Sequence, residues 1–391
     1  MPGLPRLPFE RSDPLEVSPA YAELRATAPI AKVLTAAGDE AWLVTGYEEI
    51  RQIFADPRFG RSHPVPEDAP RLSNSALIGG PVGDYATEEE MHTKLRRLLA
   101  PAFSARRMAA LSVRIQGLVD DLLGRMAEQG PPCDLHACLS VPLPVQVICE
   151  LLGVPYEDRD RFRGIAVEMT DLSDPERSAA AMREMNEYTY EIVKAKRENP
   201  AEDVYSELAA ADLPEEEIAM IAGGLLFAGH ETTVNQIDYG VLLLLRNPGE
   251  LDALRRDPSL APGAVEEIMR MAVPSQHGLL RYAHADVEVG GVRIKRGDLV
   301  VLATFAANRD PRVYPDPERF DIRRETTHPH VGFGYGAHYC LGASLARVEL
   351  QAVFGTLFRR FPELRLAVPY ESLSRRAGAL TEGFSELPVT W

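Results

Sequence analysis

Cys340 has the most distinctive chemical surroundings of any residue in this sequence. It lies in the segment Phe333-Gly-Tyr-Gly-Ala-His-Tyr-Cys340-Leu-Gly342, and glycines stand at 332, 334 and 336. Glycines let the backbone pass close to a bulky, flat group because they carry no Cβ. We expect a helix over 341–361, so Cys340 would stand at its start, where unpaired N–H groups and the positive dipole end stabilise a thiolate.

Two other interpretations of this segment compete. A cysteine is often only a small buried hydrophobe. The spacing Gly332-x-Gly334-x-x-Ala337 also satisfies the loose dinucleotide-binding pattern. That pattern needs a preceding strand, a following β unit and an acidic residue about 20 positions later. His328-Pro329-His330 makes a poor strand and the chain ends soon after the expected helix, so the context argues against a dinucleotide site.

A second group of reactive residues is Ala228-Gly229-His230-Glu231-Thr232-Thr233, inside a helix expected over 215–246. Glycine in a helix interior costs about 1 kcal/mol relative to alanine, so Gly229 requires a reason. The hydroxyl of Thr232 beside the carboxylate of Glu231 is either a local hydrogen-bonding pair or part of a proton relay.

Two charged pairs are spaced for one helix face. Glu267 and Arg270 are three residues apart, which by default is an exposed pair worth a few tenths of a kcal/mol. His92 and Arg96 are one turn apart and share a face. Taken alone, His92 is an ordinary surface residue.

The elements that must position these residues are mostly helical. We expect a helix over 19–27, strands near 30–34 and 41–45, an irregular functional loop over 56–83, helices from 88 to 246, and a helix over 261–272. Strand-like runs follow at 286–289, 292–294 and 299–304. The helix over 215–246 would span about 48 Å. Without repeats or linkers, the sequence predicts one mainly α domain over 1–391 with a minor sheet.

Composition excludes several classes of protein. The formal net charge of −16 argues against nucleic-acid binding. The apolar stretch over 218–245 is interrupted by glycines and charges, so we expect no membrane span. The first residues show no signal-peptide pattern, and Cys133, Cys138 and Cys149 have no zinc-finger spacing. We therefore expect a cytoplasmic protein whose other cysteines are small core or surface residues.

The cysteine segment resembles the haem-binding loop F-G-x-G-x-H-x-C-x-G of the cytochrome P450 superfamily, and it matches at each fixed position. Residues 228–233 resemble the family's A-G-x-D/E-T-T signature, and Glu267 with Arg270 resembles its E-x-x-R element. The order of the motifs agrees along nearly the whole chain. The bacterial enzymes of actinobacterial secondary metabolism are the most similar type. The implied fold is a triangular, helix-rich prism, with haem between the long central helix and the cysteine-loop helix.

The resemblance implies a role for each matched residue. Cys340 would be the iron ligand of haem b, Phe333 would pack near its sulfur, and Glu231 and Thr232 would organise protons for oxygen activation. Glu267, Arg270 and Arg319 would form a structural ion network. Residues implied to contact the haem are His92, Arg96, Ala228, Gly229, Arg281, Phe333, Gly334, His338 and Gly342, the cations reaching the propionates. Implied substrate contacts are Gly224, Phe227, His277 and Leu279.

The implied activity is a monooxygenase reaction that hydroxylates or epoxidises a small organic substrate with O2, as in polyketide or peptide tailoring. An oxidase of the same fold, which couples aromatic rings or desaturates, and a non-catalytic haem sensor remain alternatives. Glu231 and Thr232 favour an enzyme over a sensor. We expect a monomer that takes electrons from a ferredoxin and its NAD(P)H-dependent reductase. Arginines expected to form a positive docking patch are Arg97, Arg106, Arg107, Arg347, Arg359 and Arg360.

Overall fold

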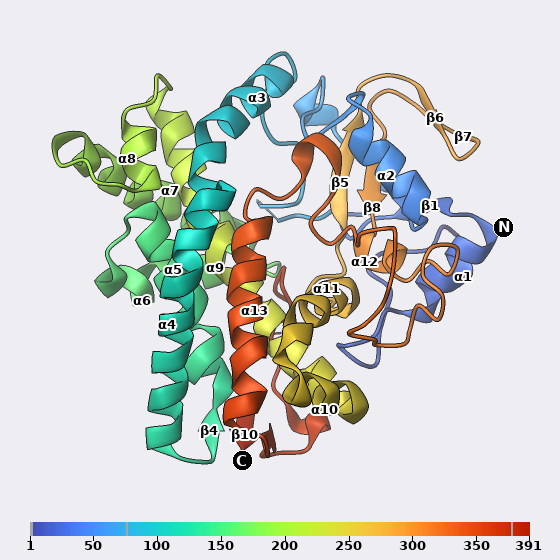
Figure 1. Ribbon diagram of the computed structural model, residues 1–391. Helices are drawn as coiled ribbons and strands as arrows, with labels where there is room; N and C mark the ends of the chain where they lie inside the picture. The colour runs from blue at the N-terminus through green and yellow to red at the C-terminus, as the bar shows by residue number, and fades with distance from the viewer. Residues whose placement is uncertain (1–2, 76, 377) are drawn as a thin grey trace. The chain divides into compact units, whose positions relative to one another are not determined.

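The computed structural model describes residues 3–75, 77–376 and 378–391 (Figure 1). Its contacts divide the chain into two compact units. Unit 1 consists of Met1–Thr93, Glu266–Phe320 and Arg324–Cys340, and unit 2 consists of Lys94–Val265, Asp321–Arg323 and Leu341–Trp391. The single domain expected over 1–391 stays a prediction.

Unit 1 is built around a mixed five-stranded sheet. The strands are β1 (Ile30–Leu34), β2 (Glu40–Val44), β8 (Leu299–Leu302), β5 (Leu279–Ala283) and β3 (Phe59–Gly60), in that spatial order. The hairpin expected near 30–34 and 41–45 is confirmed, with Ile30 paired to Val44. Strands β2 and β8 run parallel, and the other neighbours run antiparallel. After β8, the last strand of this sheet in chain order, the chain continues through residues 303–332 to the cysteine loop.

The two faces of this sheet bury different helices. Successive side chains of a strand point to opposite faces. Accordingly Val300 and Leu302 pack with α2 (Tyr47–Ala55), whereas Leu299 and Val301 pack with Tyr21 of α1 (Pro19–Thr27). The other elements of unit 1 are the hairpin β6 (Val287–Val289) and β7 (Val292–Ile294), and the short helix α12 (Thr304–Ala307).

Unit 2 is almost entirely helical. Its helices include α4 (Ala105–Gln129), α5 (Pro142–Leu152), α6 (Arg159–Met169), α7 (Pro175–Glu198), α8 (Val204–Ala209), α10 (Pro248–Arg256) and α13 (Ala343–Arg360). The long helix α9 (Glu215–Arg246) has the bounds expected from the sequence, and it packs against α7 and α5. Helices α4 and α13 lie side by side (Figure 1). A small sheet has the order β4 (Cys133–Asp134), β10 (Pro388–Thr390), β9 (Arg365–Leu366).

Two further helices, α3 (Glu88–Leu99) and α11 (Ala261–Met271), each begin in one unit and end in the other. Among the residues that the structure describes, none of the helices combines the length and the apolar character needed to cross a bilayer. The predicted fold class, mainly α with a minor sheet component, is confirmed.

Candidate active site

The cysteine loop is an irregular segment of unit 1 with one short 3₁₀ turn, Gly336–His338. The Cys340 N–H donates to the Phe333 carbonyl at 2.8 Å, which closes the loop and leaves the thiol exposed. Gly334 and Gly336 have φ of 74° and 69°, the left-handed region that favours glycine. A Cβ at Gly336 would also lie 2.9 Å from the Phe54 carbonyl oxygen. The loop shape therefore depends on these two glycines.

The expected helix starts later than the sequence suggested. Helix α13 begins at Ala343 with Gly342 as its N-cap, so Cys340 precedes its first turn by three positions instead of opening it. The expectation that the first turn itself holds the thiolate is therefore weakened. The short loop hydrogen bonds give Cys340 its position in unit 1 instead.

Basic side chains gather beside this loop. The rings of His92 and His338 lie 4.1 Å apart. Burial, together with the charges of Arg281 and His92, lowers the pKa of His338 to about 4. Burial and the nearby Arg61 lower the pKa of Arg281 to about 10, although Glu88 opposes them. The structure thus places three of the four predicted propionate-binding residues together in unit 1.

These basic side chains fit a group that carries two carboxylates. Arg281 is only 6% exposed, and its Nη1 donates to the Leu280 carbonyl while the guanidinium lies over the Phe54 ring. Neither contact neutralises the charge, and Glu88 offsets the effect of burial only in part, since the pKa of Arg281 still falls. Burying an incompletely compensated cation is costly, so an anionic ligand would stabilise this cluster. The donor set therefore suits the two propionates of a haem.

A buried ion network lies behind the loop. Glu267 and Arg270, 3% and 2% exposed, are joined by two hydrogen bonds of 2.8 and 2.7 Å. Arg270 also donates to the carbonyls of Asn308, Pro317 and Arg319 at 2.7–3.1 Å. This arginine therefore ties the helix α11 to the segment that precedes the cysteine loop.

Two arginines from the segment before the cysteine loop join this pair. Arg319 contributes its backbone carbonyl to Arg270. The Arg324 guanidinium contacts Glu267 at 3.3 Å. The predicted role of the Arg319 side chain stays a prediction. Sequence reasoning missed Arg324, because nothing in its spacing from Glu267 indicates the contact.

Helix α9 carries the second candidate group, in unit 2. Glu231 is buried, and its Oε1 accepts from Arg376 Nη2 at 2.6 Å and from Thr381 Oγ1 at 3.1 Å. Burial raises the pKa of Glu231, but Arg376, His230 and Thr381 outweigh it and leave the pKa below its usual value. The Thr232 hydroxyl is exposed and donates to the Ala228 carbonyl at 3.0 Å. The two neighbours thus have different partners and different exposure.

One face of α9 is open although most of the helix is buried. Gly224, Ala228 and Thr232, spaced four apart, are all exposed, and a Cβ at Gly224 would touch nothing within 4 Å. Gly229 has another role. A Cβ there would lie 2.2 Å from Ile148 Cδ1, so Gly229 is needed where α5 approaches α9. This close approach supplies the reason that a glycine in a helix interior requires.

Comparison with known proteins decides the family. The family described as "Cytochrome P450" matches residues 166–366. Pentalenolactone synthase of Streptomyces exfoliatus is 44% identical and covers 100% of both chains. The mycinamicin IV hydroxylase/epoxidase of Micromonospora griseorubida is 41% identical over 98% of both chains. The LnmA cytochrome P450 hydroxylase of the leinamycin pathway of Streptomyces atroolivaceus is 41% identical, with a TM-score of 0.89 over 99% of this chain and 100% of that one.

The chain belongs to the cytochrome P450 family. It is a haem-thiolate monooxygenase, and its cofactor is haem b. Like other members of the family it uses O2, an organic substrate and electrons from a redox partner.

The remaining predicted residues of this cytochrome P450 lie on the expected elements. Arg96 follows His92 by one turn on α3. Phe333 is buried, with its ring 5.5 Å from His330 and 6.2 Å from Tyr339. Leu279 opens β5 and is exposed, whereas Phe227 and His277 are partly buried. Their contacts with haem or substrate stay predictions.

Two important residues of the P450 were absent from the expectations. Arg376 and Thr381 hold Glu231 from an irregular segment near the end of the chain. No local signal links these residues to Glu231, because Arg376 lies 145 positions away from it in the chain.

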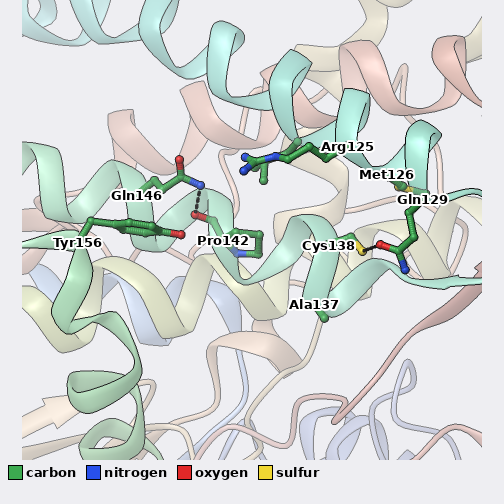
Figure 2. A pocket seen from close by; sticks show the side chains of 9 residues that line it. Arg125, Met126, Gln129, Ala137, Cys138, Pro142, Gln146 and Tyr156 are labelled. Carbon is green, nitrogen blue, oxygen red and sulfur yellow. Dashed lines mark hydrogen bonds between the residues drawn. The ribbon is translucent and has the colours of Figure 1, made fainter.

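A separate hollow in unit 2 of the P450 contains none of the predicted site residues. It measures about 220 Å³, and its lining includes Arg125 of α4, Gln146 of α5 and Tyr156, which follows α5 in the chain (Figure 2). Cys138 lies on its wall, with Sγ 3.5 Å from Gln129 Oε1 (Figure 2). Cys133 and Cys149 are buried, as expected of small core residues.

Proposed function

We propose that this cytochrome P450 hydroxylates or epoxidises a small natural product, with Cys340 as the iron ligand and Glu231 and Thr232 as the proton-delivering pair. The names of relatives support this substrate class, because they include a pentalenolactone synthase, a nocardicin C N-oxygenase and a mycinamicin IV hydroxylase/epoxidase.

In this proposal the chain holds its cofactor from unit 1. The Cys340 thiolate binds the iron, and haem, when bound, supplies the metal at which O2 is bound and reduced. His92, Arg281 and His338 bind the propionates with Arg96, which follows on the same helix. The network of Glu267 and Arg270 stabilises the loop that carries the cysteine.

The open face of α9 is the observation that carries the proposal. Gly224 has no side chain and Ala228 has only a methyl group, so neither fills the space beside this face. Thr232 lies on the same face with its hydroxyl. Glu231 lies behind it, ionised and held by Arg376. Reduction of oxygen needs protons at the site, and Glu231 can pass one to the Thr232 hydroxyl, which gives up its own. The substrate occupies the face next to Ala228, with Phe227 of the same helix limiting its size.

We further propose that a ferredoxin and its NAD(P)H-dependent reductase supply the electrons to a monomeric protein. Arg97 and Arg106 are exposed and can meet an acidic partner. Arg107 is paired with Glu207 at 3.2 Å. Arg360 lies against Asp120 of α4, about 21 Å along that helix from Arg106, so the expected basic patch is divided. The docking site is the part around Arg97 and Arg106.

The test is an optical screen of the purified holoprotein against a library of natural products. A ligand that displaces water from the iron shifts the Soret band, and turnover of that ligand under ¹⁸O2 gives a product heavier by one labelled oxygen atom. A product without the label, or one desaturated or coupled, would overturn the oxygen-insertion proposal. The reduced, CO-bound protein tests the ligand, because Cys340→Ser must abolish the thiolate-type red shift.

A further inference from the structure

A small internal cavity adjoins Glu231 inside unit 2. Its volume is about 20 Å³, and three valines with His136, Arg163, His230, Glu231 and Arg376 line it. A single water needs roughly 10–15 Å³ and two or more polar partners. The cavity meets both conditions, so it is the size of one water molecule.

His230 provides an acceptor in this cavity. Its Nδ1 lies 2.7 Å from the Leu226 carbonyl, which can only accept, so Nδ1 carries the hydrogen. Burial keeps the pKa of the ring below its ordinary value, and the histidine is therefore neutral. Its Nε2 is then a bare lone pair, and among the described residues it has no hydrogen-bond partner. A buried acceptor of this kind calls for a partner such as water.

Glu231 has one oxygen in use and one available. Both hydrogen bonds that its carboxylate accepts from the described residues, from Arg376 and from Thr381, end on Oε1. Oε2 is thus the atom at which a proton can be taken up. Because Glu231 lines the same cavity as His230, one water can reach both side chains.

His136 is a polar side chain of the cavity wall that also reaches the surface. It is 12% exposed, and its Nδ1 lies 2.7 Å from the buried carboxylate of Asp238, a contact that fixes the ring orientation. Val141, Val167 and Val234 form the apolar part of the wall, and the 50% exposure of Val167 shows that the cavity lies close to solvent.

We propose that one water in this cavity passes protons from the His136 side to Oε2 of Glu231, oriented by His230 Nε2, with Arg376 as the positioning residue. For every proton that enters the water from solvent through His136, one leaves it for Glu231, and no other bond changes. This inference rests on the proposed function, in which Glu231 passes protons on to Thr232.

The first test is structural and needs no turnover. A high-resolution crystal structure of the holoprotein is expected to show one water within hydrogen-bond distance of His230 Nε2 and Glu231 Oε2. The variant Val234→Ile adds one methyl-sized group, which is about the volume of the cavity, and is expected to remove this water without changing a polar group. Clear density for an intact cavity that contains no water in the parent protein would overturn the proposal.

The second test measures proton delivery with O2 alone as the probe. The holoprotein receives electrons from a surrogate ferredoxin and reductase, and O2 consumption and hydrogen peroxide yield are followed in H2O and D2O. Val234→Ile and His230→Leu are expected to slow O2 consumption several-fold and to change its solvent isotope effect. The control Val113→Ile makes the same substitution at an exposed position of α4 and is expected to behave like the parent.

Glu231→Gln separates the two levels of the argument. If Glu231→Gln alters these readouts but Val234→Ile and His230→Leu do not, this inference is wrong and the proposed function stands. If Glu231→Gln also has no effect, the proposed role of Glu231 itself is wrong. In each variant an unchanged CO-bound spectrum excludes loss of the haem site as the cause.

Discussion

Arg376 donates from Nη2 to Glu231 Oε1 at 2.6 Å, although 145 positions separate the two residues. The Arg376 backbone N–H is itself tied to the Gly383 carbonyl at 2.9 Å. Gly383 permits the segment to approach α9, because a Cβ there would lie 2.0 Å from Asn235 Oδ1. The glutamate of the proposed proton pair is therefore held by an irregular segment near the end of the chain.

Replacing Arg376 by glutamine is expected to reverse the pKa shift of Glu231. Burial raises this pKa, and in the parent protein the arginine and its neighbours outweigh burial. Without the cation burial dominates, so the pKa of Glu231 should rise above its ordinary value. An infrared titration of the carboxyl band would follow it. Arg376→Lys retains the charge and should keep the pKa of Glu231 close to that of the parent. Arg375→Gln, at the exposed neighbouring position, is the control and should leave this pKa unchanged.

The same substitution should change how stability depends on pH. The lowered folded-state pKa of Glu231 stabilises the parent above its unfolded pKa, and that contribution is lost as the pH falls through the folded value. In Arg376→Gln the raised pKa gives the opposite sign, so the Glu231 contribution is present at low pH and is lost as the pH rises. Denaturant unfolding across pH 4–8 checks this, and parallel curves for parent and variant would contradict it.

Breaking the buried pair of Glu267 and Arg270 should destabilise unit 1 strongly. Removing one partner leaves an uncompensated buried charge and costs about 3–5 kcal/mol. We therefore expect Arg270→Ala to lower the free energy of unfolding by that amount and to reduce the haem content of purified protein. The surface pair of Arg323 and Glu250, at 3.6 Å, is the control, and Arg323→Ala should cost less than about 1 kcal/mol. Equal losses of unfolding free energy in both variants would show that the buried network contributes no more to stability than the surface pair.

Gly336→Ala should impair the cysteine loop more than an alanine at another left-handed glycine. Both Gly336 and Gly38 have positive φ, so each substitution carries a backbone cost of about 1–2 kcal/mol. Only at Gly336 does the added Cβ also approach a backbone oxygen, that of Phe54, at 2.9 Å, whereas Gly38 has nothing within 4 Å. Thermal unfolding and the haem-to-protein ratio should separate the two variants. Matching losses would mean that the Phe54 contact is unimportant.

Local signals predicted the elements better than the contacts between them. Pro214 and Asn247-Pro248 bracket α9, and so its bounds were readable in the sequence. The start of α13 was placed two residues early because nothing in the sequence marks Gly342 as the N-cap. The hydrogen bonds that Arg376 and Thr381 donate to Glu231 could not be predicted, since these residues lie 145 and 150 positions away from it in the chain. Likewise, the contact of Arg324 with Glu267 has no local signature, because 57 positions separate the two residues.

Gly229→Ala should destabilise unit 2 although alanine is the better helix former. The added Cβ would lie 2.2 Å from Ile148 Cδ1, and overpacking of this kind costs about 1–3 kcal/mol, against a gain in helix propensity of about 1 kcal/mol. Gly224→Ala on the same helix meets nothing within 4 Å, so it should stabilise by up to about 1 kcal/mol.

The double variant of Gly229→Ala and Ile148→Ala isolates the contact. Ile148→Ala alone should cost about 2–5 kcal/mol because it leaves a cavity between α5 and α9. Combined with Gly229→Ala, the new methyl group occupies part of that space, and the total cost should fall below the sum of the two single variants. Urea unfolding of all four proteins measures the coupling free energy. If the two effects simply add, Ile148 is not the reason for Gly229, and the close approach of α5 to α9 has another cause.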